Sequence, residues 1–272
     1  MAFARYSELD ARIPSVALQE KMKMAARFVL QAAICLALFT LVGCSQAQDR
    51  EHRQLAEEYA RKGEIQPAIA ELGRIKHSTS DDLSARGELL IQLGRPQFEE
   101  AAKAFQGALR LDKQSARAFY GLGLLAASKA DFTEAEAFFR KALAIQPTAV
   151  HAQNALAGVL TYQGNYAEAE RLYLALEGNP TVGSLVLGNL GELYLRQGKL
   201  DLAEAKLKEA IVVLPGNFDW HRHLAEVYRL QGRNTNAASE YRRALELLAT
   251  SPAADRSLTE ELAGRLREVE QR

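Results

Sequence analysis

The chain has 272 residues, of which 34 are lysine or arginine and 34 are aspartate or glutamate, so its formal net charge is zero. Because this balance leaves no surplus of cations to displace the counterions of a phosphate backbone, we expect no nucleic acid among its partners. The two cysteines, Cys35 and Cys44, both precede the long helical region, so no disulfide is expected within that region.

The N-terminal part has the layout of a secretory leader. Residues 1–21 are polar and lack periodicity, whereas residues 22–43 combine a positive flank, Lys23 and Arg27, with an apolar run over 28–42. This run is short for a membrane span and suits a signal peptide. Because a polar extension ahead of a leader is unusual, we expect translation to begin at Met22 or Met24 rather than at Met1.

The apolar run ends in Leu41, Val42, Gly43 and Cys44, which resemble the lipobox of bacterial lipoproteins. The resemblance implies an acylated Cys44 as the first residue of the mature protein, with residues 44–48 as a short tether. The residue directly after Cys44 is Ser45, and not the aspartate that at this position resembles an inner-membrane retention signal. We therefore expect an outer-membrane anchor with the domain in the periplasm. Two or three acyl chains would hold it firmly. The alternative is an apolar helix with a chance cysteine.

From residue 49 onward the chain repeats a pattern of two short amphipathic helices. In the clearest copy, Gly123 and Ala135 are small where the helices approach closely, Phe139 is predicted to fill the space between units, and Pro147 ends the second helix. The pattern resembles the tetratricopeptide repeat (TPR), whose period is about 34 residues. This implies an all-α solenoid, a right-handed superhelix of six helix-turn-helix units: 49–79, 80–115, 116–149, 150–183, 184–217 and 218–251.

The last part of the chain predicts one more helix. Within 255–272, Leu258, Leu262, Leu266 and Val269 form one apolar stripe with charged residues elsewhere. We interpret it as a capping helix over the last hydrophobic face of the solenoid, with a partner-binding helix as the alternative.

Two local features of the repeats carry further expectations. Five of the six units have a glycine in the turn between their helices, but the third has Ala130, so that turn must avoid a positive φ or accept strain. In the fourth unit, the second helix is expected to end early, at residues 178–180.

The search for chemistry finds no catalytic, metal or cofactor motif. His221 and His223 are two residues apart on a predicted helix, and we interpret them as surface or groove residues without a metal. Asp81 and Asp82 are interpreted as solvated charges at a helix start. Trp220 is predicted to pack at a junction between units. We therefore predict a protein that is not an enzyme.

Function is expected on the concave groove that the first helices of TPR units line. Carrying the groove positions of the family onto this chain gives eleven candidates: Arg117, Tyr120, Leu124, His151, Asn154, Tyr162, Glu192, Arg196, Arg222, Glu226 and Arg229. Such a mixture suits an extended or helical peptide, with tyrosine and arginine as anchors. The alternative is an ordinary solvated inner face. Asn189 matches one position of the clamp for chaperone C-termini, but the neighbouring units lack the rest, so that clamp is absent.

A lipobox followed by TPR units resembles the layout of the outer-membrane pilotin lipoproteins of type IV pilus systems. Similar layouts occur in TPR lipoproteins of tight-adherence pilus loci and of exopolysaccharide export. The resemblance implies a non-catalytic scaffold that recruits a protein client, such as a secretin or pilus-assembly component. Two alternatives remain: a regulatory subunit of a periplasmic enzyme complex, and a soluble cytoplasmic interaction module.

Overall fold

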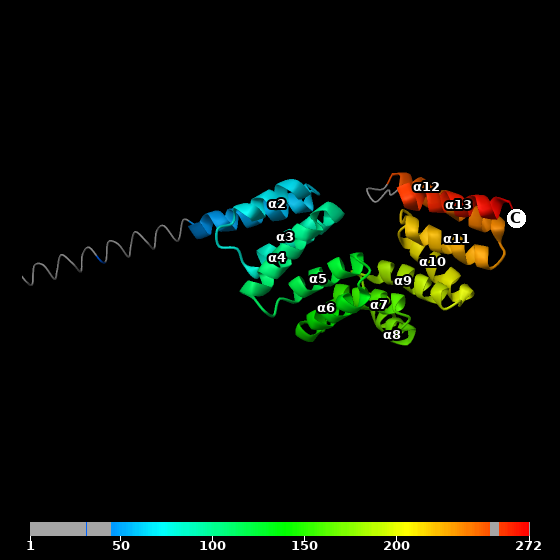
Figure 1. Cartoon of the computed structure of the whole chain (residues 1–272), viewed down its shortest axis with the longest axis horizontal. Helices are drawn as coiled ribbons and strands as arrows, with labels where there is room; N and C mark the ends of the chain where they lie inside the picture. Colours follow the sequence, from blue (N-terminus) through cyan, green and yellow to red (C-terminus); the bar gives the residue numbers. More distant parts are fainter. Residues whose placement is uncertain (1–30, 32–44, 251–255, 272) are drawn as a thin grey trace, which may run out of the picture. The chain divides into compact units, whose positions relative to one another are not determined.

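The computed structural model describes residues 31, 45–250 and 256–271, and these form two compact units divided after residue 78 (Figure 1). All regular structure in these ranges is helical, so the prediction of an all-α fold is confirmed. The lipobox residues Leu41, Val42, Gly43 and Cys44 lie outside the described residues, as do the extension 1–21 and almost all of the leader.

The first unit is a pair of helices, a helix over residues 45–61 and α2 (Ile65–Arg74). The chain reverses between them at Gly63, whose φ of 77° needs a residue without a β-carbon. Ala56, Ala68 and Leu72 are buried. Residues 45–48 are already helical, so the structure corrects the expected tether over 44–48 in this part.

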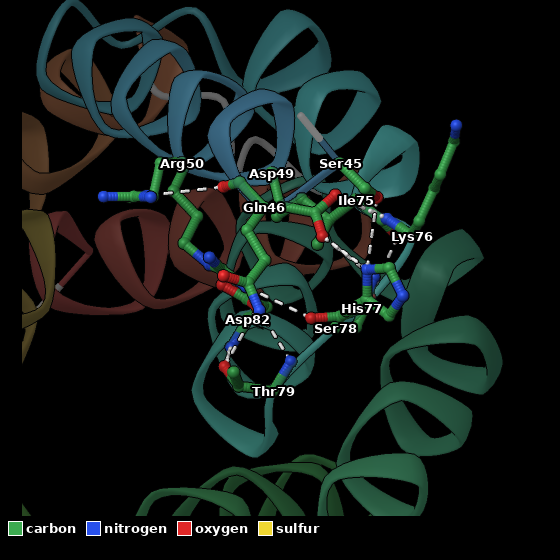
Figure 2. A network of polar contacts seen from close by, with 11 residues as sticks. Ser45, Gln46, Asp49, Arg50, Ile75, Lys76, His77, Ser78, Thr79 and Asp82 are labelled. Carbon is green, nitrogen blue, oxygen red and sulfur yellow. Dashed lines mark hydrogen bonds and ion pairs between the residues drawn. The ribbon is translucent and has the colours of Figure 1, made fainter. Parts of the chain in front are cut away.

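A buried carboxylate joins the start of this first helix to the segment after α2 (Figure 2). Asp49 is 2% exposed and accepts hydrogen bonds from the backbone N–H groups of Lys76 at 2.9 Å and His77 at 3.2 Å. Its Oδ2 also lies 2.9 Å from His77 Nδ1. The hydrogen bond from the Lys76 N–H has the largest effect on the pKa of Asp49. Together with the contacts to His77, it lowers this pKa. Asp49 therefore holds the start of the first helix to the segment that follows α2.

The second unit stacks helix pairs in chain order and ends in a single helix (Figure 1). The first helices contact one another in series, α3 to α5, α5 to α7, α7 to α9 and α9 to α11, and form one layer. The second helices pack against them. The bounds are α3 Ser80–Gln92, η1 Arg95–Gln97, α4 Phe98–Leu111, α5 Ala116–Ser128, α6 Phe132–Ile145, α7 Val150–Tyr162, α8 Tyr166–Leu176, α9 Gly183–Arg196, α10 Leu200–Val213, α11 Phe218–Leu230, α12 Asn234–Ala249 and α13 Arg256–Glu270.

Glycines in the first helices make room for rings of the second helices. A β-carbon on Gly123 would lie 2.5 Å from the ring of Phe139, and Phe139 also meets Tyr120 at 5.8 Å between ring centroids. Phe139 thus packs inside its own unit, and the expected packing between units stays a prediction. Phe105 does both, because its ring would overlap a β-carbon on Gly87 of its own unit and on Gly121 of the next.

The turns between paired helices share a residue with positive φ. Gly63, Gly94, Gly164, Gly198 and Gly232 all have positive φ, and Ala130 also has a positive φ, of 60°. The turn at Ala130 therefore accepts the strain that a β-carbon causes in the left-handed region. The shortened helix in the fourth unit is also present: α8 ends at Leu176 after 11 residues, whereas α6 and α10 have 14.

Two histidines predicted at the surface or the groove and one aspartate predicted to be solvated are buried. His221 is 7% exposed and His223 is 9% exposed, because α11 is covered by α9, α10 and α12. His221 Nδ1 lies 2.6 Å from the Glu240 carboxylate, and its Nε2 lies 3.2 Å from the Pro215 carbonyl oxygen. Asp82 is also buried, because it forms a capping box with Thr79 at the start of α3.

The end of the solenoid matches the prediction. The helix α13 packs on α12 and buries Leu262 and Val269, so it covers the last hydrophobic face as a capping helix. Trp220 is 4% exposed and lies against Gly188 of the preceding first helix, which makes it part of a junction between units.

Candidate functional site

Seven of the eleven predicted groove residues line two pockets on the second unit. We call the first the α5 pocket; it has a volume of about 370 Å³ and includes Arg117, Tyr120 and His151. We call the second the cap pocket; it has a volume of about 240 Å³ and includes Glu192, Arg196, Arg222 and Glu226. The remaining four candidates, Leu124, Asn154, Tyr162 and Arg229, line neither pocket.

The α5 pocket combines a largely aliphatic wall with an ion pair at its edge. Its wall comes from Ala116, Ala142, Ala149, Val150 and Ala152, with Gln146 and Thr148 from the loop after α6. The guanidinium of Arg117 donates to the carboxylate of Glu88 at 2.7 and 2.5 Å. Burial raises the pKa of Tyr120, so its hydroxyl stays protonated at neutral pH. Such a pocket suits an apolar side chain with a polar group beside it.

The cap pocket draws its walls from four helices. Glu192, Leu195 and Arg196 come from α9, and Arg222, His223 and Glu226 come from α11; Tyr241 of α12 and Glu261, Leu262 and Arg265 of α13 complete it. The groove positions of the family lie only on the first helix of each unit. The sequence analysis therefore missed Tyr241, Glu261, Leu262 and Arg265. The charged face of the predicted capping helix was the signal that could have indicated its contribution.

Two of the three acidic groups at the cap pocket, Glu192 and Glu226, are already engaged. Glu192 pairs with Arg196 at 2.9 Å, and Glu226 accepts hydrogen bonds from Arg229 at 2.8 Å and from the Tyr241 hydroxyl at 2.8 Å. Burial works to raise the pKa of Glu226, but the bonds from Arg229 and Tyr241 lower it overall. The predicted candidate Arg229 therefore acts by neutralising Glu226 rather than by lining the pocket.

His223 is a buried ionisable side chain of the cap pocket. Its Nε2 lies 2.9 Å from Nη2 of Arg222, which can only donate, so Nε2 is the accepting nitrogen and the proton of the neutral ring is on Nδ1. Burial lowers the pKa of His223 to about 4, so the ring is neutral at pH 7. Nδ1 is buried and has no hydrogen-bond partner in the described part of the chain.

The other candidates connect neighbouring units. Tyr162 stacks on Phe132 at 5.0 Å between centroids, and the guanidinium of Arg196 lies 4.1 Å from the Tyr162 ring centroid. Asn189 donates to Asn154 at 3.0 Å, which joins α7 to α9. Leu124 is half-buried and packs against the core. These contacts hold the layer of first helices together beside the pockets.

Neither metal chemistry nor a membrane span is indicated where the structure is described. Among residues 31, 45–250 and 256–271, no group of three or more histidine, cysteine, aspartate or glutamate side chains is placed to hold a metal ion. In the same ranges no helix is both long enough and apolar enough to cross a membrane.

Family comparisons agree with the stacked helix pairs. Models described as tetratricopeptide repeat match residues 84–150, 150–175 and 189–252. The chain is a tetratricopeptide repeat protein. Repeats of this kind form solenoids whose exposed faces bind other proteins, which fits the two pockets on the layer of first helices.

Curated relatives of this TPR protein match part of its length. Cellulose synthase 1 operon protein C of Komagataeibacter xylinus is 27% identical over 161 residues, which are 54% of this chain and 12% of the relative. Tetratricopeptide repeat protein 7B of Homo sapiens is 34% identical over 41% of this chain and 13% of the relative. Cellulose synthase operon protein C of Pseudomonas fluorescens is 32% identical over 44% of this chain and 9% of the relative. The matched part of this chain thus spans about a tenth of the length of these proteins.

Solved structures share the fold at low sequence identity. A tetratricopeptide repeat protein from Parabacteroides merdae superimposes with a TM-score of 0.62 at 19% identity, over 93% of this chain and 98% of that chain. PilW, described as a widely conserved type IV pilus biogenesis factor, superimposes with a TM-score of 0.57 at 20% identity, over 71% of this chain and 90% of that chain.

Proposed function

We propose that this TPR protein is a non-catalytic scaffold that binds a protein client on its layer of first helices. The observation that carries the proposal is the pair of pockets there, one with aliphatic walls and one with polar walls. Residues from successive repeats line both, so an extended segment of a client can place several side chains at once. The tyrosines and arginines at these pockets are the residue types that most often dominate binding energy.

We further propose that the scaffold is anchored to the bacterial outer membrane and faces the periplasm. The sequence from Leu41 to Cys44 supports this proposal through its resemblance to a lipobox. A diacyl or triacyl anchor on Cys44 would give firm attachment, whereas one chain gives only marginal binding. Because the helix over 45–61 is held to the segment after α2 by Asp49, the first unit would lie close to the membrane surface.

The proposed client is a component of envelope assembly, with a secretin or another pilus-assembly protein as the first candidate. The likeness of fold to PilW and the lipoprotein layout support this choice. A second candidate is a component of polysaccharide export. It is favoured by the two cellulose synthase operon proteins among the relatives, whose similarity covers about half of this chain.

A capture experiment from detergent-solubilised envelopes tests these proposals. The baits are the wild-type chain, Cys44→Ala, the groove variant Arg196→Ala, and Arg243→Ala as a matched control, because Arg243 is exposed on α12 and pairs with Glu246 of the same helix. We expect mass spectrometry to find a pilus or polysaccharide-export component with the wild type and the control, and at least about fivefold less with Arg196→Ala.

The same experiment separates the alternatives. Capture of an enzyme whose activity changes on binding would instead indicate a regulatory subunit. If Cys44→Ala fractionates like the wild type and only cytoplasmic proteins are captured, the anchor and the envelope role are both wrong. Equal capture by Arg196→Ala and Arg243→Ala would contradict binding at the first helices.

A further inference from the structure

The cap pocket contains a hydrogen-bond donor that the described chain does not satisfy. Nε2 of His223 accepts from Arg222, which leaves the proton on Nδ1, and Nδ1 is buried without a partner. Nearly all buried N–H groups in folded proteins are paired, so an unpaired one at a pocket indicates an acceptor that comes from outside the chain. Because Nδ1 itself is buried, the acceptor must be an oxygen or nitrogen lone pair that enters the pocket and reaches this nitrogen as the side chains that cover it move aside.

The charges around the pocket restrict the kind of acceptor. Its lining holds three arginines, Arg196, Arg222 and Arg265, and three glutamates, Glu192, Glu226 and Glu261. With the neutral His223 ring, this set is balanced. Because Glu192 and Glu226 are already paired with Arg196 and Arg229, an uncharged group keeps this balance, whereas an incoming carboxylate or ammonium would add a net charge to the pocket.

The size and mixed polarity of the pocket restrict the acceptor further. Its volume of about 240 Å³ exceeds the roughly 150 Å³ of a cavity that holds benzene, so one side chain or one peptide group fits. An amide offers both a carbonyl oxygen and N–H donors. The carbonyl oxygen matches the Nδ1 proton, and the N–H groups match the exposed carboxylate of Glu261 at the rim.

We propose that the cap pocket binds an uncharged amide of the client, whose carbonyl oxygen accepts the hydrogen bond from His223 Nδ1. This inference rests on the proposed client-binding function and names the chemistry of one of its two pockets. The amide is either the side chain of an asparagine or glutamine, or a peptide group of the client backbone. In both cases His223 selects for an acceptor without charge, and α13 closes the pocket on the side of the cap.

Disulfide trapping tests this proposal with the full-length chain, because its only cysteines are Cys35 and Cys44. Both are replaced by serine, and Leu195→Cys then places one thiol in the pocket lining without changing its charge. Four fragments of similar size compete with a reductant, each supplied as its symmetrical disulfide so that thiol–disulfide exchange forms the bond and releases one fragment thiol. They are the disulfides of 3-mercaptopropionamide, of its N-methylamide, of 3-mercaptopropionate and of 3-methylbutane-1-thiol. Mass spectrometry measures the fraction of protein that each fragment labels. Leu230→Cys, outside the pocket and 49% exposed, is the matched control position.

We expect at least one amide fragment to stay bound at a reductant concentration about fivefold higher than the carboxylate and hydrocarbon fragments tolerate. A factor of this size corresponds to one hydrogen bond between uncharged groups. Adding His223→Phe should remove this preference, and Leu230→Cys should show none. Retention of the primary amide alone indicates an asparagine or glutamine side chain, and equal retention of the N-methylamide indicates a backbone group. Preference for the carboxylate, or equal retention of all four fragments because water satisfies Nδ1, overturns the proposal.

A second measurement avoids the cysteine variant. In the wild-type chain labelled with ¹⁵N-histidine, propionamide should shift the His223 ring signals saturably, whereas propionate should not, and exposed His77 of the first unit, which lines neither pocket, serves as the internal control. No shift with either probe overturns the proposal if trapping also shows no preference. If the chain captures an envelope client but shows no preference for amides, this inference fails and the proposed client-binding function stands. If it captures no client, the proposed function itself fails, so the two outcomes can be told apart.

Discussion

The indole of Trp220 on α11 occupies the space that a side chain on Gly188 of α9 would need. A β-carbon on Gly188 would overlap the indole Nε1, and both residues are buried. The contact joins the fifth and sixth predicted repeats, so the stability of the solenoid at this junction depends on a glycine inside a helix.

We therefore expect Gly188→Ala to lower the free energy of unfolding by about 1 to 3 kcal/mol, because the indole must move or the helices must separate. Urea denaturation followed by fluorescence measures this, since Trp220 is the only tryptophan. Gly158→Ala is the control: its β-carbon would meet only the Tyr173 hydroxyl at an ordinary 3.5 Å, and alanine should stabilise α7 by about 0.5 kcal/mol or more. Equal effects of the two changes would contradict the packing described.

The strained turn at Ala130 should be improved by glycine. Ala130 has φ of 60°, where a β-carbon crowds the backbone, while the equivalent turns use glycine. We expect Ala130→Gly to raise the free energy of unfolding by about 0.5 to 1 kcal/mol, despite the entropy that glycine adds to the unfolded chain. Ala127→Gly, in the last turn of α5, should lower it by a similar amount. Thermal and urea unfolding of both variants provide the comparison, and a loss of stability in Ala130→Gly would show that the turn is not strained.

Acid should weaken the contact between α10 and the turn that begins α12. Burial works to raise the pKa of Glu204, but hydrogen bonds from Lys208, Arg233 and Gln231 lower it to about 2. A folded-state pKa below the unfolded value of about 4.3 contributes stability above that value, and the contribution is lost as pH falls toward 2.

We expect Glu204→Gln to be less stable than the wild type by about 1 to 2 kcal/mol at pH 7, after allowance for solvent screening. The difference should shrink steadily below about pH 4.5. Urea titrations between pH 3 and 7 measure it. Glu209→Gln, an exposed change on the same helix, serves as the control. A difference that stays constant over this range would contradict the depressed pKa of Glu204.

The buried Asp49 should control the local stability of the first unit (Figure 2). In Asp49→Asn, one acceptor oxygen is replaced by a donor, so the N–H groups of Lys76 and His77 lose part of their pairing. We expect hydrogen exchange of these two amides to accelerate at least about tenfold, while amides in α9 and α11 keep their rates. Glu51→Gln, exposed on the same helix, should leave all of them unchanged. Unchanged exchange at Lys76 and His77 in Asp49→Asn would contradict the role of this carboxylate.

Local pattern predicted the helical architecture well, and the reasons are visible in single residues. The glycine or alanine in each turn between paired helices sits at a positive φ, and Gly123 faces the ring of a second helix. These features repeat because each helix pair meets the same steric demands. Predictions failed for His221 and His223, whose burial depends on the helices packed around α11, whereas sequence spacing alone indicated the surface or the groove. Asp82 is buried for a local reason, its capping box with Thr79.

The sequence by itself determined the repeat, the helix pairs, the capping helix and the faces that carry polar residues, because contacts between residues three or four positions apart set these features. It also carries the lipobox pattern ending at Cys44, on which the proposed anchor rests. Only the tertiary structure brought His223 of α11, Tyr241 of α12 and Arg265 of α13 to one pocket. That convergence depends on how three helices pack, and neither the period of the repeat nor the position of any one residue in it specifies which donor remains unpaired.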